Sequence, residues 1–252
     1  MKQPRPKKRQ RLWVGGAVMA GLVAVVIAVT FGANLWKHDL RVAYVRTAGN
    51  RVVSSEEILR SAAIKRDTRL FDVDLFAVEE RVRKNHFFRS VSVNRNAPDA
   101  ITIAVVERTP VAVLPGENLL TIDDEGMVLP YTASEYTFDL PVLTGLLSGH
   151  DLKPGRHLSS ETVREALSVL AVAREIGEDA YRRISELHFR KDGELILFTS
   201  ERGIPVLFGR GEVVNKLIKL DGFWKEIVSR RGPQDLVYVD VRFTDQVVVR
   251  WN

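Results

Sequence analysis

The sequence predicts an α+β fold that follows a single N-terminal membrane-spanning helix. Three observations carry this prediction. An uncharged apolar run near the start is long enough to cross a bilayer as a helix. Two amphipathic helical patterns then fall between alternating segments, and helices on one face of a small sheet make an α+β arrangement. The stretch 236–251 alternates between apolar and polar residues, as a half-buried strand does.

A basic segment precedes the apolar run. Residues 1–11 contain six Lys or Arg and no Asp or Glu. The 25 residues from Leu12 to Trp36 carry no charged side chain, and a helix needs about 20 residues to cross a hydrocarbon core. Because basic flanks resist translocation, we expect a cytoplasmic tail at 1–11, a transmembrane helix at 12–36 and a body on the far side of the membrane.

A cleaved secretory signal is the alternative for this run. Such a signal usually has an apolar core of about 7–15 residues that ends in a cleavage site of small residues. The run here is longer, and Trp13 and Trp36 lie at its ends, where interfacial aromatic residues are common. These features favour an uncleaved anchor.

Composition excludes several classes of function. Subtracting the six tail cations from 37 leaves 31 Lys and Arg against 32 Asp and Glu, so the body is near neutral and its sequence does not favour nucleic-acid binding. The absence of cysteine excludes disulfides, thiolate metal sites and cysteine nucleophiles. A body of this length buries an adequate core without them.

The first module of the body, residues 40–109, is predicted to run strand, helix, helix, strand, strand. Ser54 and Glu57 form a capping box, which starts the first helix. Asp74 caps the second helix, whose apolar residues recur at helical spacing. The expected elements are a strand at 41–46, helices that start at Ser54 and Asp74, and strands around 91–93 and 101–105.

The second module, residues 110–252, is predicted to be a mixed β domain with an antiparallel sheet and packed helices. Its longest helix is expected at 212–230 and ends at Gly232-Pro233. In the final stretch, Val237, Val239, Val241 and Phe243 point to one side, and Tyr238, Asp240 and Arg242 point to the other. The other expected elements are strands at 111–114, 119–122, 127–129, 184–189, 194–199 and 205–208, and a helix from Ser160.

No catalytic, cofactor-binding or metal-binding constellation is predicted. The five histidines are scattered, without a second ligand at metal spacing. Asp123-Asp-Glu-Gly126 and Gly209-Arg-Gly211 are interpreted as turns rather than as cation or phosphate sites. The sequence lacks a G-x-S-x-G nucleophile elbow. We therefore expect a binding protein that is not an enzyme and that has no small-molecule substrate.

The final strand is the best candidate for a binding surface. A terminal strand often lies at a sheet edge, where its free backbone groups accept a strand from a partner. The alternative is that 238–251 is ordinary core sheet. The residues themselves leave both interpretations open.

Several stretches, taken in order, carry a family resemblance. They are Val45-Arg-Thr-Ala-Gly-Asn50, Glu79 to Ser90, Val93 to Pro98, Val106 to Ala112, Leu120 to Val128, Leu140 to Gly145, Phe208 to Glu212 with Lys216, and Tyr238 to Phe243 with Trp251. Their order and spacing resemble those of the FtsQ/DivIB family of bacterial division proteins over nearly the whole chain.

The resemblance implies a POTRA domain at 40–109, a family β domain at 110–252 and a scaffold of the divisome at the septum. It implies a single-pass protein of the inner membrane, anchored by Leu12 to Trp36, with a cytoplasmic N-terminus and a periplasmic body. The implied partners are FtsB-like and FtsL-like proteins and, through them, FtsW and FtsI. The end at Asn252, without the long tail common in DivIB, favours the FtsQ side of the family and a Gram-negative envelope.

The resemblance also assigns a partner-binding site to this chain. An FtsB-like strand would pair with the last strand of the β domain, beside Arg242 and Phe243, and Arg210 would lie nearby. The expected partner-binding residues are Tyr238, Val239, Asp240, Val241, Arg242, Phe243, Trp251 and Arg210. On this basis 238–243 would be an exposed edge, and Arg242→Glu would repel the partner while leaving the fold intact.

Two other classes of function remain as alternatives. A POTRA-type chaperone or transport accessory of the envelope is the first, although such domains usually occur in arrays before a β-barrel. A membrane-anchored envelope hydrolase is the second, and it would need a nucleophile and base or a metal group. Filamentation after depletion would favour division, whereas turnover of envelope substrates would favour the hydrolase.

Overall fold

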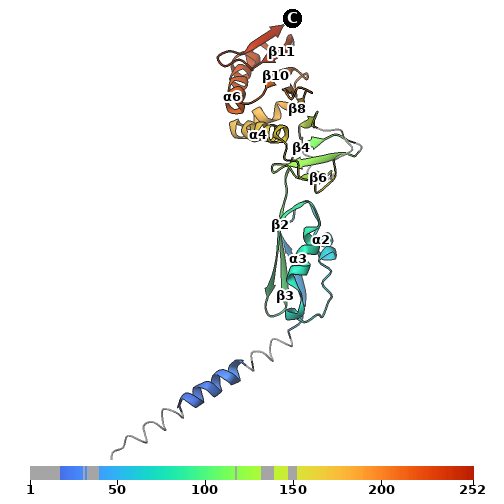
Figure 1. Cartoon of the computed structure of the whole chain (residues 1–252), viewed down its shortest axis with the longest axis vertical. Helices are drawn as coiled ribbons and strands as arrows, with labels where there is room; N and C mark the ends of the chain where they lie inside the picture. Colours follow the sequence, from blue (N-terminus) through green and yellow to red (C-terminus); the bar gives the residue numbers. More distant parts are fainter. Residues whose placement is uncertain (1–17, 31, 33–39, 117, 132–138, 147–151) are drawn as a thin grey trace, which may run out of the picture. The chain divides into compact units, whose positions relative to one another are not determined.

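The computed structural model of the protein describes residues 18–30, 32, 40–116, 118–131, 139–146 and 152–252. Contacts divide the chain into two compact units (Figure 1). The first comprises Met1–Lys84 and Ser90–Val105, and the second comprises Asn85–Arg89 and Val106–Asn252. The described strands form one sheet that begins with β1 and a second, larger sheet that contains β4 to β12.

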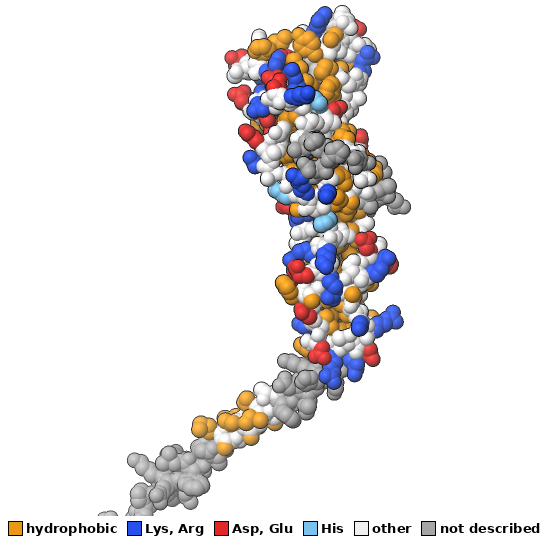
Figure 2. Space-filling view, turned by 45° about the vertical axis from the view of Figure 1, so that its right-hand side comes forward, with side chains coloured by type: hydrophobic (Ala, Val, Ile, Leu, Met, Phe, Trp, Pro, Cys, Tyr) orange, Lys and Arg blue, Asp and Glu red, His pale blue; other side chains and the backbone are white. Residues whose placement is uncertain are grey.

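Residues 18–30 form a helix with exposed apolar side chains (Figure 2). Inside it, Thr30 Oγ1 donates to the carbonyl of Val26 at 2.8 Å. Within the described residues, no helix combines the length and the apolar character that crossing a membrane requires. The predicted tail at 1–11 and both ends of the predicted span at 12–36 lie outside the described residues.

The first sheet and its helices have the predicted order of strand, helix, helix, strand, strand. The elements are β1 (Tyr44–Ala48), α2 (Ser55–Ala62), the short 3₁₀ helix η1 (Leu70–Asp72), α3 (Leu75–Arg83), β2 (Phe88–Asn96) and β3 (Ala100–Glu107). The first strand lies further along the chain than the predicted 41–46, and η1 was not predicted. Among the described strands the order is β1-β3-β2, with β1 parallel to β3, so β1 lies at an edge.

The two predicted helix caps are confirmed. Ser54 Oγ accepts a hydrogen bond from the Glu57 backbone N–H at 3.2 Å. Asp74 Oδ1 accepts one from the Ala77 N–H at 3.1 Å. Each cap satisfies a backbone donor that the first turn of a helix leaves unpaired. The helices therefore start where the sequence places them.

The described part of the second unit forms a nine-stranded sheet in the order β12-β11-β10-β9-β8-β7-β4-β5-β6. Its strands are β4 (Pro110–Leu114), β5 (Leu120–Asp123), β6 (Val128–Pro130), β7 (Val142–Thr144), β8 (Ile184–Phe189), β9 (Leu195–Thr199), β10 (Pro205–Gly209), β11 (Leu236–Asp240) and β12 (Val248–Trp251). The strand β7 was not predicted, since three residues carry almost no alternation.

The prediction of an antiparallel sheet is wrong for part of this sheet. The pairs β4–β7, β7–β8 and β10–β11 are parallel. A parallel pair needs a long crossover connection, and the helices between β7 and β8 and between β10 and β11 supply it. The sheet is therefore mixed, and the α+β class holds.

The helices of this unit are α4 (Glu161–Ile176), α5 (Glu178–Arg182), α6 (Val213–Phe223), the π-helix η3 (Trp224–Val228) and α7 (Ser229–Arg231). The helix predicted from Ser160 is α4, and Ser160 Oγ accepts a hydrogen bond from the Val163 N–H. The helix predicted at 212–230 is confirmed as one continuous helical run from Val213 to Arg231, in which the π-helical turn η3 separates α6 from α7. Its predicted apolar face is only partly correct: Leu217, Trp224 and Val228 are buried, whereas Val214, Ile218 and Ile227 are exposed.

One hydrophobic core joins these helices to the larger sheet. Buried residues of α4, α6 and η3 belong to the same cluster as those of the strands, and α4 packs against α6 (Figure 1). Phe208 on β10 is the largest fully buried side chain of the described residues. The core thus lies directly beneath β10 and β11.

Candidate functional site

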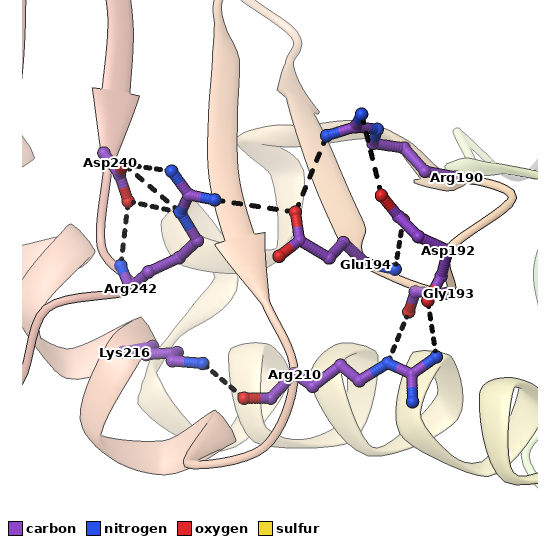
Figure 3. A network of polar contacts seen from close by, with 8 residues as sticks. All are labelled: Arg190, Asp192, Gly193, Glu194, Arg210, Lys216, Asp240 and Arg242. Carbon is purple, nitrogen blue, oxygen red and sulfur yellow. Dashed lines mark hydrogen bonds and ion pairs between the residues drawn. The ribbon is translucent and has the colours of Figure 1, made fainter.

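Four strand ends and the turns that join them meet at one end of the larger sheet. The parallel strands β10 and β11 end there. Because β9 is antiparallel to both β10 and β8, β9 begins there and β8 ends there. We call this region, residues 190–194, 209–212 and 240–247, the turn end of the sheet. It gathers polar side chains that are far apart in the sequence (Figure 3).

Arg242 is held by Asp240 at the turn end. Its Nη2 lies 2.7 Å from Asp240 Oδ2 and its Nε lies 3.0 Å from Oδ1, while the Arg242 backbone N–H donates to the same Oδ1 at 3.0 Å. Burial raises the pKa of Asp240, but hydrogen bonds from Arg242 outweigh it and hold that pKa below its ordinary value. The same bonds raise the pKa of Arg242. The guanidinium is therefore a structural partner of a buried carboxylate.

Glu194 extends this pair into a network. Its Oε2 lies 3.5 Å from Arg242 Nη1 and 3.6 Å from Arg190 Nη1 (Figure 3). Arg190 also faces Asp192 at 3.6 Å. The network thus links the β8–β9 turn to the segment after β11.

Arg210 also holds the β8–β9 turn, through hydrogen bonds to its backbone carbonyls. Its Nε donates to the Gly193 carbonyl and its Nη2 donates to the Asp192 carbonyl, both at 2.9 Å. Gly193 has φ +80°, and a Cβ there would overlap the Arg210 guanidinium. The positive φ therefore favours glycine, and a side chain there would also displace the Arg210 guanidinium.

Two lysines of α6 hold the loops behind these arginines. Lys216 is buried, its Nζ donates to the Arg210 carbonyl at 2.6 Å, and burial lowers its pKa. Lys219 Nζ donates to the carbonyls of Val241 at 3.3 Å and Thr244 at 3.2 Å, and also to the carbonyl of Phe243. The Lys219 ammonium group thus fixes the loop after β11.

The prediction that 238–243 forms an exposed edge is wrong. The strand β11 lies between β10 and β12, and it pairs antiparallel with β12 from Leu236↔Trp251 to Asp240↔Val248. The edge of the sheet is therefore β12. The hairpin that follows Asp240 brings β12 back alongside β11.

The sequence-predicted site residues fall into two groups. The side chains of the first group are buried and support the exposed residues of the site from the core. They are Val239, Asp240 and Val241. Phe243 is 47% exposed and does not continue the buried side of the strand. The members that reach the surface at least partly are Tyr238, Arg210, Arg242, Phe243 and Trp251.

Trp251 lies on the edge strand itself. The Arg231 guanidinium stacks on its ring at 3.9 Å from the centroid. Such stacking fixes both side chains. Arg231, Lys219, Arg190 and Glu194 were not identified from the sequence. Arg231 meets Trp251, Lys219 meets the loop after β11 and Glu194 meets Arg242 across separations that no local pattern records.

Two groups of residues could suggest catalysis or cation binding, and the structure gives the contacts of each. Asp123 Oδ1 accepts from the N–H groups of Glu125 and Met127, as a hairpin turn requires. Thr144 Oγ1 lies 2.6 Å from Glu186 Oε1 and 2.7 Å from His188 Nδ1. The Thr144 hydroxyl donates to Glu186, so His188 Nδ1 contacts the oxygen of the same hydroxyl. Within the described residues no group of three potential metal ligands is found.

Comparisons with known proteins agree with these features. The family described as "POTRA domain, FtsQ-type" matches residues 40–108. The family described as "Cell division protein FtsQ/DivIB, C-terminal" matches residues 112–242, a range that contains most of the turn end.

Individual relatives also belong to this family. The cell division protein FtsQ of Rhodothermus marinus is 31% identical over 233 residues, which cover 89% of this chain and 83% of the relative. FtsQ of Geobacter sp. strain M21 is 30% identical over 211 residues, covering 84% and 76%. DivIB of Clostridium acetobutylicum is 26% identical over 106 residues, 42% of each chain. The chain belongs to the FtsQ/DivIB family of cell division proteins.

Proposed function

We propose that this protein is a membrane-anchored, non-catalytic scaffold of the divisome, which recruits FtsB-like and FtsL-like partners and links early and late division proteins at the septum. The domains of this scaffold are a cytoplasmic tail at 1–11, an inner-membrane span at 12–36, a periplasmic POTRA domain at 40–109 and a β domain at 110–252. FtsW and FtsI join through the FtsB–FtsL pair. No cofactor takes part.

The edge strand β12 carries this proposal. It ends the strand order of the larger sheet, so one side of its backbone has no strand partner among the described residues. An extended partner segment adds to such an edge through backbone hydrogen bonds, and side chains beside the edge select the partner. Exposed Phe243 precedes β12 and half-buried Trp251 is its last residue, and both offer that apolar contact.

The arginines contribute differently from Phe243. Arg242 is already paired with the Asp240 carboxylate, whereas Arg210 keeps its charge and donates to two carbonyl groups. Arg242 holds the start of the loop that presents Phe243, and Arg210 holds the neighbouring β8–β9 turn. Both retain free donors for partner carboxylates, since a guanidinium has five N–H groups. Arg242→Glu would set a carboxylate against Asp240 and Glu194, so it would disturb the fold as well as the partner. It is therefore a poor probe, contrary to the expectation from the sequence.

Phe243→Ala tests the proposal with a matched control. Tyr131 follows β6 at the opposite edge of the same sheet and is 45% exposed, against 47% for Phe243. Truncation of an anchoring aromatic residue typically costs about 2 kcal/mol, roughly a thirty-fold loss of affinity. We expect that loss for Phe243→Ala and none for Tyr131→Ala, in calorimetry of the full chain with an FtsB–FtsL complex. Parent-like binding by Phe243→Ala would refute the β12 site.

The anchor has its own test. The positive charges before the span keep the N-terminus inside. A reporter fused after Asn252 should therefore be active only in the periplasm. Activity of that fusion in the cytoplasm would refute the proposed topology, whatever the outcome of the binding experiment.

A further inference from the structure

A groove lies beside β1, within the first unit. It has a volume of about 410 Å³ and is lined by Val42 to Arg46, by Leu59 and Ala62 of α2, and by Ile64 to Arg66. One side of β1 pairs with β3, and the other side has no strand partner among the described residues. The groove therefore runs along an open sheet edge.

The chain itself shows that this side of the backbone accepts an extended segment. Immediately before β1, the Val42 N–H donates to the Thr68 carbonyl at 2.9 Å, and Leu70 N–H donates to the Leu40 carbonyl at 2.8 Å. Arg41 and Arg69 form an antiparallel bridge there. The N–H groups of Ala43 and Tyr44 point the other way, both to the Asp99 carbonyl, at 2.8 and 3.2 Å. Because strand backbone groups alternate in direction, those of Val45 point to the same open side as those of Val42.

The side chains of the groove combine apolar surface with positive charge. Tyr44 is 59% exposed and Leu59 is 38% exposed, although both are large apolar residues. The cations Arg46, Lys65 and Arg66 also line the groove, and its lining contains no carboxylate. None of the three cations forms an ion pair within the described part of the chain. The groove thus offers backbone pairing, an apolar contact and unneutralised positive charge together.

We propose that this groove binds an extended acidic segment of another protein, which adds to β1 as a strand. One apolar side chain of the segment packs against Leu59 and Tyr44. Its carboxylates face Arg46, Lys65 and Arg66. The combination favours a strand over a lipid headgroup, because a headgroup would use the cations but neither the open backbone edge nor the apolar contact. The POTRA domain then has a partner of its own, separate from the one at β12.

The probe is a synthetic peptide of alternating sequence, EVELEVE, with a fluorophore at its N-terminus. Two matched peptides accompany it: KVKLKVK, which reverses the charge, and EVELEVE with alternate amides N-methylated, which keeps the charge and removes backbone pairing. Anisotropy is measured with the full chain in nanodiscs of uncharged lipid. We expect binding of EVELEVE, at least about tenfold weaker binding of the methylated peptide, and none of KVKLKVK.

Variants of the chain locate the binding. Leu59→Glu and the pair Arg46→Glu with Lys65→Glu should each weaken EVELEVE at least about tenfold. Lys84→Glu is the control, because it reverses an exposed cation of the same unit outside the groove. Slower amide hydrogen exchange at 44–48 in the presence of EVELEVE would support strand addition.

Several outcomes would overturn the proposal. Equal binding of the methylated peptide would show attraction by charge alone. The same conclusion follows if Lys84→Glu weakens binding as much as the groove variants. Absence of EVELEVE binding, with binding of the parent but not of the groove variants to vesicles of anionic lipid, would assign the cations to a lipid surface instead.

Discussion

The two sheet edges of this protein use positive charge in opposite ways. At the turn end beside β12, Arg242 is paired with Asp240, Arg210 with backbone carbonyls, and Lys219 with the loop after β11. At β1, Arg46, Lys65 and Arg66 line an open groove without an ion pair among the described residues. A count of basic residues would rate the two edges alike. Their hydrogen-bond and ion-pair partners distinguish them. The cations at the turn end hold loops of the protein in place, whereas those at β1 are available to a ligand.

The difference has a physical cause. The loops at the turn end place carbonyl and carboxylate oxygens next to a buried core, where leaving them without donors would cost about 1–3 kcal/mol each. The cations there satisfy those oxygens. Exposed cations at β1 are solvated by water and need no partner for folding. Binding at β1 should accordingly weaken with salt more than binding at β12 does.

Phe208→Ala should have the largest effect, because it opens a cavity under β10 and under the turn end. Phe208 is fully buried, and Lys216 Nζ lies 5.3 Å from its ring centroid. Truncation of a buried phenylalanine costs about 3–5 kcal/mol. Urea unfolding of the full chain, followed by tryptophan fluorescence, measures the loss. A change below about 1 kcal/mol would show that the turn end does not depend on this core.

Asp240→Asn should have the next largest effect. It removes the charge that holds Arg242, and hydrogen bonds to charged groups contribute about 1.5–3 kcal/mol. We expect a stability loss of about that size, measured by urea unfolding. Arg242→Gln is the matched control, since both changes break the same pair; the double variant should be no worse than the more damaging single variant if the two side chains act together.

The same pair predicts a dependence on pH. Hydrogen bonds from Arg242 hold the pKa of Asp240 below its ordinary value of 3.8, although burial opposes them. The stabilisation is therefore complete above that ordinary value and is lost as the pH falls through the lower value of the folded state. The acid limb of the stability profile should be flatter for Asp240→Asn than for the parent. Identical limbs would contradict the assignment.

Gly193→Ala should have a smaller effect, which is centred on Arg210. The positive φ of Gly193 and the overlap of a Cβ with the guanidinium both oppose a side chain there, and strain of this kind costs about 1–3 kcal/mol. Gly203 also has a positive φ, of +61°, but it has no atom within 4 Å of its ideal Cβ position. Gly203→Ala therefore isolates the backbone part. Equal losses in the two variants would show that the contact with Arg210 contributes nothing.

Arg46→Gln should have the smallest effect of all. Surface substitutions away from specific contacts usually change stability by less than about 0.5 kcal/mol. Arg46 fits that description, whereas Arg242→Gln removes a carboxylate partner. Thermal unfolding of the two variants compares the edges directly. A loss at Arg46 as large as that at Arg242 would remove the distinction between them.

Local signals in the sequence predicted the parts of the fold that depend on local chemistry. Ser54 and Asp74 start helices because a side-chain oxygen accepts a nearby N–H, and that pairing spans only three residues. The strand order of the larger sheet has no such local cause. The chain cannot reveal that β7 lies between β4 and β8, since those pairings join distant segments.

The candidate site shows the same division. Arg242 and Phe243 were proposed from the family pattern. The alternation placed Val239 and Val241 on one side of the strand, and both are buried, but Asp240 on the other side is buried as well. Alternation does not hold at Phe243, because β11 ends at Asp240. Hydrogen bonds from Lys219 to backbone carbonyls determine the conformation of the loop beyond it. The sheet edge was predicted at 238–243, but β12 pairs with β11 and forms the edge instead. The alternation of apolar and polar residues in one strand does not reveal which strand pairs with it.

The parallel pairing of β10 with β11 sets an order of assembly. A strand cannot join its parallel neighbour until the connecting helices, α6 to α7, have crossed the sheet. Contacts of that kind close long loops and form late in folding. The strand β12 pairs with β11 in a local hairpin that can form early, but it joins the larger sheet only through β11, so the surface proposed for the partner is completed when β11 meets β10. A chain that is misfolded at its core would offer that partner nothing to pair with.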